Sequence, residues 1–210
     1  MEKRDYRVVA FDLDGTFLNT DKSISPINIE AVKNAADRGA YIVPTTGRTF
    51  DGVPKQIRDL PFVRYLITAN GGGIYDLKQE KHIYTVPLPL SEVLPLHDFF
   101  RRQPCCIGVY YEDGGYMQEN DLGTMDYYFS VDAPVRDFLK GYYKPLQNIY
   151  ETFLTRDVEI LKYQVYFRHP EYRTPLFDRL SKEFPNLVFT TSVANNIECN
   201  HKGADKGTAL

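Results

Sequence analysis

The chain has 210 residues, enough to bury a sizeable core in one domain or two small ones. Its apolar fraction of 43% and charged fraction of 25% are ordinary for a soluble globular protein. A net charge of −3 gives no electrostatic reason to expect nucleic acid or an anionic membrane as a partner, and no apolar run approaches the length of a membrane-spanning helix. We therefore expect a soluble protein with neither kind of partner.

The cysteines and the N-terminus both suggest the cytoplasm. Cys105, Cys106 and Cys199 form neither a disulfide framework nor a zinc-binding spacing, so we expect reduced thiols in a reducing compartment. Residues 1–5 are mostly charged and lead straight into an apolar run, which predicts that no signal peptide is present.

The first predicted strand ends in two acids. An unbroken apolar run at residues 8–11 is followed by Asp12 and Asp14, then Gly15 and Thr16. Such a run is typical of a parallel strand buried on both faces, whose carboxyl end is where ligands bind. Two carboxylates held close together need a cation, or one must keep its proton. This pattern suits a site where a divalent metal holds one acid while the other moves a proton, with the Gly15 backbone free to approach an anion.

A βαβ unit follows. Ser25 before Pro26 marks a helix start, apolar residues recur at helical spacing, and Gly39 can end the helix in a left-handed conformation. The next apolar strand, at residues 41–44, leads into Thr45-Thr46-Gly47-Arg48. A hydroxyl, a glycine-freed backbone and a guanidinium at this sheet edge can cradle a phosphate. The alternative is a simple turn with a solvated arginine.

Together these motifs resemble a known superfamily. Asp-Leu-Asp-Gly-Thr at residues 12–16 is similar to the first motif of the haloacid dehalogenase superfamily of phosphatases and phosphotransferases, and Thr46 stands where the second motif has its phosphate-binding hydroxyl. Thr-Gly-Arg after a strand resembles the Cof-type subgroup, subclass IIB. The resemblance implies an α/β fold, with a Rossmann-like core built on a parallel sheet and an inserted α+β cap domain.

The resemblance also implies a domain division. A third strand at residues 65–68 precedes Asn70 and three glycines, where the core of Cof-type proteins gives way to the cap and faces the substrate. We therefore expect a hinge here, with the core at residues 1–82, the cap at 83–187, and a return to an incomplete core at 188–210. Clustered aromatics in the cap either pack against a sheet or form a stacking slot for a ring-bearing substrate.

The last eight residues resemble the third motif, in which a lysine precedes glycine at the start of a helix. Lys202 and Lys206 both precede glycine, and Lys206 matches better because the Gly207-Thr208 sequence fits the helix opening. An ammonium beside carboxylates and a phosphate would neutralise charge on both. The family pattern continues with a fourth, acidic motif, so we expect a truncated chain, weak magnesium binding and an open edge on the first strand.

The resemblance implies a magnesium-dependent phosphomonoester hydrolase. Asp12 would attack phosphorus to form an aspartyl phosphate, and Asp14 would act as acid and base. Thr46 and Lys206 would complete the catalytic set, and Asp12 and Asp14 would hold Mg²⁺. The residues implied to contact the phosphate are Gly15, Thr46, Gly47, Arg48, Asn70 and Lys206.

The expected partner is a small phosphorylated metabolite. Sugar phosphates are the commonest substrates of the subgroup, with nucleotide and cofactor phosphates next, and the intact protein is expected to be a monomer or homodimer. Two alternatives remain from the sequence. One is a sugar phosphomutase or phosphotransferase, and the other is a catalytically impaired module that binds a phosphorylated ligand or pairs through the open strand edge.

Overall fold

The computed structural model describes residues 7–128 and 140–210. The chain forms two compact units, the first comprising Met1–Thr85 and Asp205–Leu210 and the second Val86–Ala204. An α/β chain with one unit inserted into the other agrees with the expected fold class. Residues 1–5, on which the signal-peptide expectation depends, lie outside the described part of the chain.

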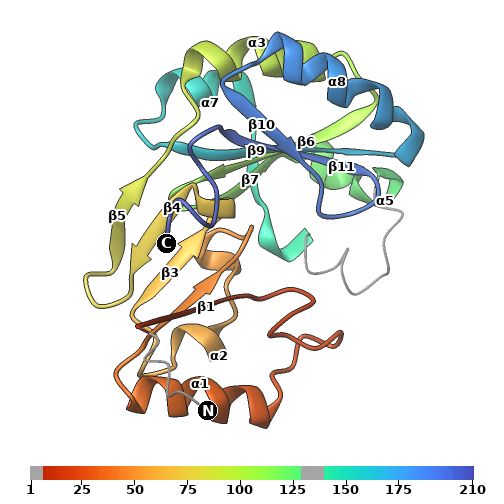
Figure 1. Ribbon diagram of the computed structural model, residues 1–210. Coiled ribbons are helices and arrows are strands. Elements are labelled where there is room, and N and C mark those ends of the chain that lie inside the picture. The colour runs from red at the N-terminus through yellow and green to blue at the C-terminus, as the bar shows by residue number, and fades with distance from the viewer. Residues whose placement is uncertain (1–6, 129–139) are drawn as a thin grey trace. The chain divides into compact units, whose positions relative to one another are not determined.

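The first unit is built on a five-stranded sheet in the order β1-β2-β3-β4-β5 (Figure 1). The strands β1, β2 and β3 pair in parallel, whereas β4 and β5 add antiparallel at one side, so the sheet is mixed and not wholly parallel. The elements of this unit are β1 (Val8–Asp12), α1 (Pro26–Asp37), β2 (Tyr41–Thr45), η1 (Phe50–Gly52), α2 (Lys55–Arg58), β3 (Tyr65–Thr68), η2 (Ala69–Gly71), β4 (Gly73–Asp76) and β5 (Lys81–Thr85).

The predicted βαβ unit is confirmed. Helix α1 begins at Pro26 after Ser25, and Gly39, with φ of 89°, follows the helix in the left-handed region. The face of α1 that carries Val32 packs with Ile42 and Ile57 in one hydrophobic cluster beneath the sheet. This packing holds α1 against one face of the sheet.

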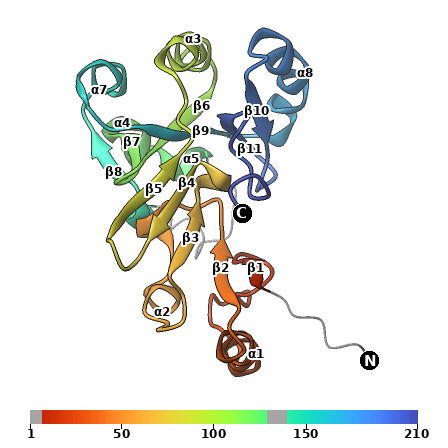
Figure 2. The same ribbon diagram turned by 60° about the vertical axis from the view of Figure 1, so that its left-hand side comes forward.

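The expectation that β1 is buried on both faces is wrong. Figure 2 shows β1 at one edge of its sheet, and β2 is its only partner strand among the described residues. Val9 and Phe11 pack against the helix-side cluster, while Val8 on the opposite face is 41% exposed. Strand β2 instead buries Ile42 in the helix-side cluster and Val43, on the opposite face, in a small cluster with Ile67 and Ala209.

The expected hinge at the glycine run is also not what the structure contains. Asn70 and Gly71 adopt positive φ angles of 61° and 105°, and the chain turns back so that Gly73 begins β4 beside β3. Glycine serves here to turn a strand sharply within one sheet. The second unit begins only at Val86, after β4 and β5.

The second unit is built on a six-stranded sheet in the order β10-β11-β9-β6-β7-β8. All its pairs are antiparallel except the parallel pair β7–β8. The described elements are α3 (Leu90–Phe100), β6 (Cys105–Tyr111), β7 (Gly114–Gln118), α4 (Glu119–Gly123), α5 (Met125–Tyr128), β8 (Lys144–Leu146), α7 (Ile149–Thr155), β9 (Ile160–Phe167), η3 (Pro170–Tyr172), α8 (Thr174–Glu183), β10 (Leu187–Thr190) and β11 (Asn196–His201).

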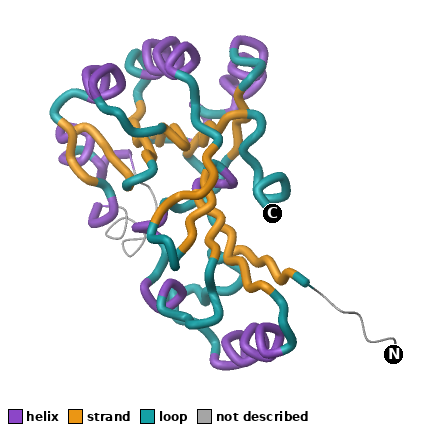
Figure 3. The backbone as a smooth tube through the Cα atoms, turned by 90° about the vertical axis from the view of Figure 1, so that its left-hand side faces the viewer, coloured by secondary structure: helices purple, strands orange, loops and turns teal. Residues whose placement is uncertain are grey.

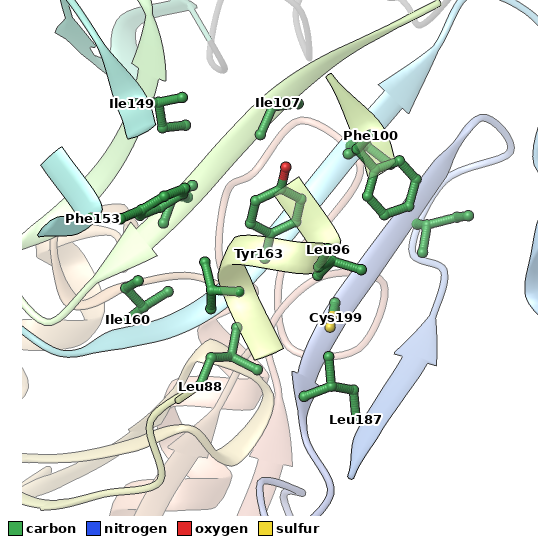
Figure 4. Packing of buried hydrophobic residues seen from close by; sticks show 14 of the residues in the cluster. Leu88, Leu96, Phe100, Ile107, Ile149, Phe153, Ile160, Tyr163, Leu187 and Cys199 are labelled. Atoms are coloured by element: carbon green, nitrogen blue, oxygen red, sulfur yellow. The ribbon is translucent and has the colours of Figure 1, made fainter. Parts of the chain in front are cut away.

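The main core of this unit lies between its sheet and the helices α3, α7 and α8. These helices lie on one side of the strands (Figure 3). Figure 4 shows Leu96 and Phe100 of α3 beside Tyr163 of β9, and all three side chains are at most 1% exposed. Of the clustered aromatics noted in the sequence, Tyr143 is 4% exposed and packs with Tyr110 and Tyr166 of the sheet in a second cluster, as one of the two interpretations proposed, whereas Phe129 lies outside the described residues.

The strands β10 and β11 belong to this second sheet, although we expected residues 188–210 to return to the core. Strand β11 pairs with β9, and its apolar residues Ile197 and Cys199 are buried in the same cluster as Tyr163. The short alternating pattern of β11 serves the second core, and sequence periodicity alone does not say which sheet a strand joins. The chain re-enters the first unit at Asp205.

Among the described residues, no helix combines the length and the apolar character that crossing a bilayer requires.

Candidate active site

The ends of three parallel strands bring the predicted site residues to one sheet edge. Asp12, the last residue of β1, is in register with Thr45 of β2, which is in register with Ile67 of β3. The Thr45 hydroxyl donates to the Phe11 carbonyl at 3.2 Å, and the backbone N–H of Thr46 donates to the Ile67 carbonyl at 2.8 Å. These bonds continue the ladder past the strands, so the loops that follow are held close to one another.

The loop at residues 13–18, which carries Asp14, is held by apolar side chains that pack on the helix side of the sheet. Leu13 is fully buried, and Phe17 and Leu18 are at most 6% exposed, so all three fix the loop in the cluster beneath the sheet. Because neighbouring side chains point in opposite directions, Asp12 and Asp14 are left on the solvent side, with side chains 37% and 41% exposed. Gly15 makes the turn with φ of 73°.

Lys206 lies directly against Asp12. Its Nζ donates to Asp12 Oδ1 at 2.7 Å, although 194 positions separate the two residues. Lys202, the rival candidate in sequence, lies in the second unit. Of the two lysines, Lys206 is therefore the one whose ammonium lies at the end of β1.

The segment that carries Lys206 is held by Asp205. The Asp205 carboxylate accepts from the backbone N–H groups of Gly207 and Thr208, both at 2.9 Å, and the Ala209 N–H donates to the Asp205 carbonyl at 3.0 Å. This is the capping pattern of a helix start, although the residues that follow form turns and not the expected helix.

Gly71 permits this segment to approach the sheet. A Cβ placed on Gly71 would lie 2.9 Å from the Asp205 Cα and closer still to its carbonyl carbon and oxygen. Because the colliding atoms are backbone, no side-chain rotation would relieve the clash. The close approach therefore requires glycine, and it fixes the residue that immediately precedes Lys206.

Asp14 is bound by two cations. Arg48 donates from Nε to Oδ2 at 2.8 Å and from Nη2 to Oδ1 at 2.7 Å, and Lys22 Nζ donates to the same Oδ1 at 2.9 Å. Burial raises the pKa of Asp14, but the hydrogen bonds and charges of Arg48 and Lys22 outweigh burial and hold it below its usual value. As it stands in this structure, Asp14 is suited to act as a base, and its protonated form is disfavoured.

The other predicted phosphate-binding residues lie in the loops after β2 and β3, which are joined by hydrogen bonds. Thr46 is 2% exposed, and its hydroxyl accepts from the Arg48 backbone N–H at 3.2 Å across Gly47. The Asn70 N–H donates to the Thr46 carbonyl at 3.0 Å, and the Ala69 N–H donates to the Arg48 carbonyl at 2.8 Å. The loops after β2 and β3 therefore support each other.

Two features of the site were not predicted from the sequence: the position of Lys22 and the close approach that Gly71 permits. Lys22 comes from the polar connection before α1, and its positive φ of 64° is not visible in the sequence. The Asn19-Thr20-Asp21 stretch before it signals a turn, but nothing in that signal says what the turn faces.

The carboxylate oxygens at this sheet edge are the type of ligand that magnesium prefers. Mg²⁺ prefers oxygen, keeps several waters, and is usually held by one or two carboxylates together with substrate phosphates. Asp12 Oδ2 accepts no hydrogen bond from residues 7–128 or 140–210, so one carboxylate oxygen remains to meet a cation. No cluster of three or more acidic, histidine or cysteine side chains suited to a metal occurs in the described chain. Asp12 thus offers one oxygen to a weakly held, water-rich Mg²⁺, whereas both Asp14 oxygens accept hydrogen bonds from Arg48 and Lys22.

Comparisons with known proteins agree with this arrangement. Residues 9–210 match the family model of haloacid dehalogenase-like hydrolases, so the chain belongs to that family. Among solved structures, a haloacid dehalogenase-like hydrolase from Bacillus subtilis superposes with a TM-score of 0.79 at 20% identity, over 97% of this chain and 76% of that one. A subclass IIB sugar phosphatase superposes with a TM-score of 0.74 at 19% identity, over 97% and 73% of the chains. These two likenesses establish the fold.

Two curated relatives are named as phosphatases. The chain is 27% identical to an HMP-PP phosphatase of Yersinia pseudotuberculosis over 98% of its length and 70% of that protein's length. It is 41% identical to the 5-amino-6-(5-phospho-D-ribitylamino)uracil phosphatase of Bacillus subtilis, over 36% of this chain and 30% of that protein. The matched region thus covers less than a third of the second relative.

Proposed function

We propose that this protein is a magnesium-dependent phosphomonoester hydrolase that acts through an aspartyl-phosphate intermediate. The observation that carries the proposal is the 2.7 Å contact between Lys206 Nζ and Asp12 Oδ1 at the end of β1. A carboxylate nucleophile must approach a phosphate that is itself negatively charged, so a cation beside it lowers the electrostatic barrier. The phosphatases among the relatives support the same chemistry.

Asp12 is the proposed nucleophile, and its carboxylate oxygen displaces the leaving alkoxide from phosphorus. Asp14 removes a proton from the water that hydrolyses the intermediate, a role that suits its ionised form. To protonate the leaving oxygen, Asp14 must first lose the stabilisation that two cations give its charge. Magnesium bound at Asp12 and Asp14 would neutralise charge on the phosphate.

The remaining residues position the phosphoryl group. The Thr46 hydroxyl, the Gly47 backbone and the Lys206 ammonium are proposed to hold its oxygens, with Gly15, Arg48 and Asn70 nearby in the chain's loops. The second unit is proposed to act as the cap that selects the leaving group. Sugar phosphates are the first substrates to test, followed by nucleotide and cofactor phosphates, and the cytoplasm is the proposed location.

Hydrolysis of p-nitrophenyl phosphate tests this function. We expect activity that requires Mg²⁺, is removed by a chelator, and is lost in an Asp12→Asn variant, because an amide is a far poorer nucleophile. Asp37→Asn is the matched control, since Asp37 forms an exposed ion pair with Lys33 on α1. Retention of activity by Asp12→Asn would refute the nucleophile assignment. Adding an acceptor sugar and measuring transfer distinguishes a phosphotransferase.

The open edge of β1 supports a second candidate, a module that pairs with another strand. Val8 at that edge is 41% exposed, and β1 has one partner strand among the described residues. Size-exclusion chromatography would show a defined complex if this is the function, and a monomer with phosphatase activity would exclude it.

A further inference from the structure

Lys22 reaches the site from a compact turn at residues 19–23. The Asn19 N–H donates to the Ser23 carbonyl and the Lys22 N–H donates to the Asn19 carbonyl, both at 2.9 Å. The Asp21 carboxylate accepts from the Ser23 N–H at 3.0 Å and from the Ser23 hydroxyl at 2.6 Å. The base of the turn is joined to the acidic loop by bridges from Leu18 to Asp14 and Ile24. The turn that carries Lys22 is therefore held in one conformation by its own hydrogen bonds.

The backbone of Lys22 is strained in this turn. Its φ of 64° lies in the left-handed region, which favours glycine and is unfavourable for a long side chain. Backbone strain of this kind is often found where a side chain must point in a particular direction. Here the result is that Nζ lies 2.9 Å from Asp14 Oδ1.

Asp14 does not need Lys22 for its own neutralisation. Arg48 already makes two hydrogen bonds to the Asp14 carboxylate, and Arg48 Nη1 is tied to the Gly52 carbonyl at 2.8 Å. The Arg48 side chain is 13% exposed, whereas that of Lys22 is 50% exposed. Arg48 is thus the fixed partner of Asp14, and Lys22 is the partner that can leave.

The ion pairs at the site carry excess positive charge. Lys206, Arg48 and Lys22 are three cations facing two carboxylates, those of Asp12 and Asp14. A phosphate monoester carries close to two negative charges at neutral pH. The excess cation is therefore available to an incoming phosphate, and Lys22 is the one that can reach it at least cost to the structure.

We propose that Lys22 is a substrate-binding residue that exchanges its bond with Asp14 for a bond with the phosphoryl group when substrate enters. This inference rests on the proposed function. The exchange removes one of the two cations that bind Asp14, while Arg48 keeps the carboxylate in place. The ligand chemistry is that of a phosphate dianion, free or esterified.

Binding of inorganic phosphate, measured by isothermal titration calorimetry on the whole chain, tests the proposal directly. We expect Lys22→Met to weaken phosphate binding roughly tenfold, equivalent to about 1.4 kcal/mol. Lys22→Arg should restore most of the loss, and the effect of Lys22 should shrink as salt is raised, because the side chain is half exposed. Lys33→Met, which removes an exposed lysine on α1, is the matched control and should change nothing.

Lys22→Gly separates binding from folding. Glycine accepts a φ of 64° without strain, so this variant should unfold at the same urea concentration as the parent or at a higher one. We expect it to lose phosphate affinity as Lys22→Met does. Lys22→Met and Lys22→Gly should also raise KM for p-nitrophenyl phosphate more than they lower kcat.

The outcomes distinguish this inference from the proposed function. Phosphate binding that is unchanged in Lys22→Met overturns the role of Lys22, even if the protein is a phosphatase. A fall in kcat with phosphate affinity unchanged would instead make Lys22 a support for Asp14 and also overturn the proposal. If the parent chain binds phosphate through Lys22 but hydrolyses no ester, the proposed function fails and the inference stands. If the parent binds no phosphate, the inference fails.

Discussion

Replacing Gly71 with alanine is expected to disturb the candidate site without touching any residue that would bind substrate. The new Cβ would lie 2.9 Å from the Asp205 Cα and nearer still to the Asp205 carbonyl. Asp205 immediately precedes Lys206, so the backbone must move at the residue that sets the position of the ammonium. The structure therefore predicts two effects of one methyl group, one on stability and one on catalysis.

The size of the stability effect has two parts. Gly71 has φ of 105°, and forcing a residue with a Cβ into the left-handed region costs about 1–2 kcal/mol. Overpacking against backbone adds about 1–3 kcal/mol. Gly39→Ala is the matched control, because Gly39 has φ of 89° but nothing within 4 Å of an added Cβ. The excess loss in Gly71→Ala over Gly39→Ala should therefore be about 1–3 kcal/mol.

The assays are urea unfolding followed by circular dichroism, suited to a chain with no tryptophan, and steady-state phosphatase kinetics. A displacement of about 1 Å at a catalytic group can cost on the order of a hundredfold in rate. We expect Gly71→Ala to lose activity on that scale at temperatures where it remains folded, and Gly39→Ala to keep normal activity. If the two variants behave alike in both assays, the contact between Gly71 and Asp205 does not position Lys206.

Two further predictions concern the second unit. Burial, with help from Arg101, lowers the pKa of His97 to about 4, whereas unfolded histidine titrates near 6.5. As the pH falls, the unfolded state therefore binds the proton before the folded state does, and folding loses stability. Between pH 7 and pH 4, the free energy of unfolding should fall by up to about 3 kcal/mol more in the parent than in His97→Gln. Equal pH dependence of the two proteins in urea unfolding would contradict this. Lys162 and Glu198 are each at most 7% exposed and lie 3.5 Å apart. Lys162→Met alone should cost about 3 kcal/mol, and adding Glu198→Gln should recover part of that loss; strictly additive effects in a double-mutant cycle would show that the two charges are not coupled.

The site residues that directly follow the first two parallel strands were predictable from the sequence. Asp12, Asp14 and Gly15 follow one strand and Thr46 follows the next, and the rule that parallel strands end at one sheet edge brings them together. The resemblance to a known family then selected Lys206 from the far end of the chain. For Asp12, Asp14 and Thr46, the strand pattern and the family motifs select the same residues, because the first two motifs lie at the ends of β1 and β2.

The remaining features of the fold and the site depend on contacts between distant parts of the chain, which local residue patterns do not determine. Strands β10 and β11 were expected in the first sheet, but β11 pairs with β9, and a strand's alternation is the same whichever sheet it joins. The glycines after β3 were expected to form a hinge and instead make a tight turn within the sheet. Lys22 was missed because its direction depends on an unusual φ angle that only the folded turn imposes.

Capture of the phosphorylated enzyme tests the central claim most directly. In an Asp14→Ala variant, p-nitrophenyl phosphate should still transfer its phosphoryl group, because p-nitrophenolate leaves without a proton from an acid, while hydrolysis of the intermediate lacks its base. Acid quenching followed by mass spectrometry of peptides is then predicted to find phosphate on Asp12, in an amount approaching one per enzyme. Phosphate on another residue, or continued hydrolysis with no phosphorylated peptide at all, would contradict the assignment of Asp12 as the nucleophile.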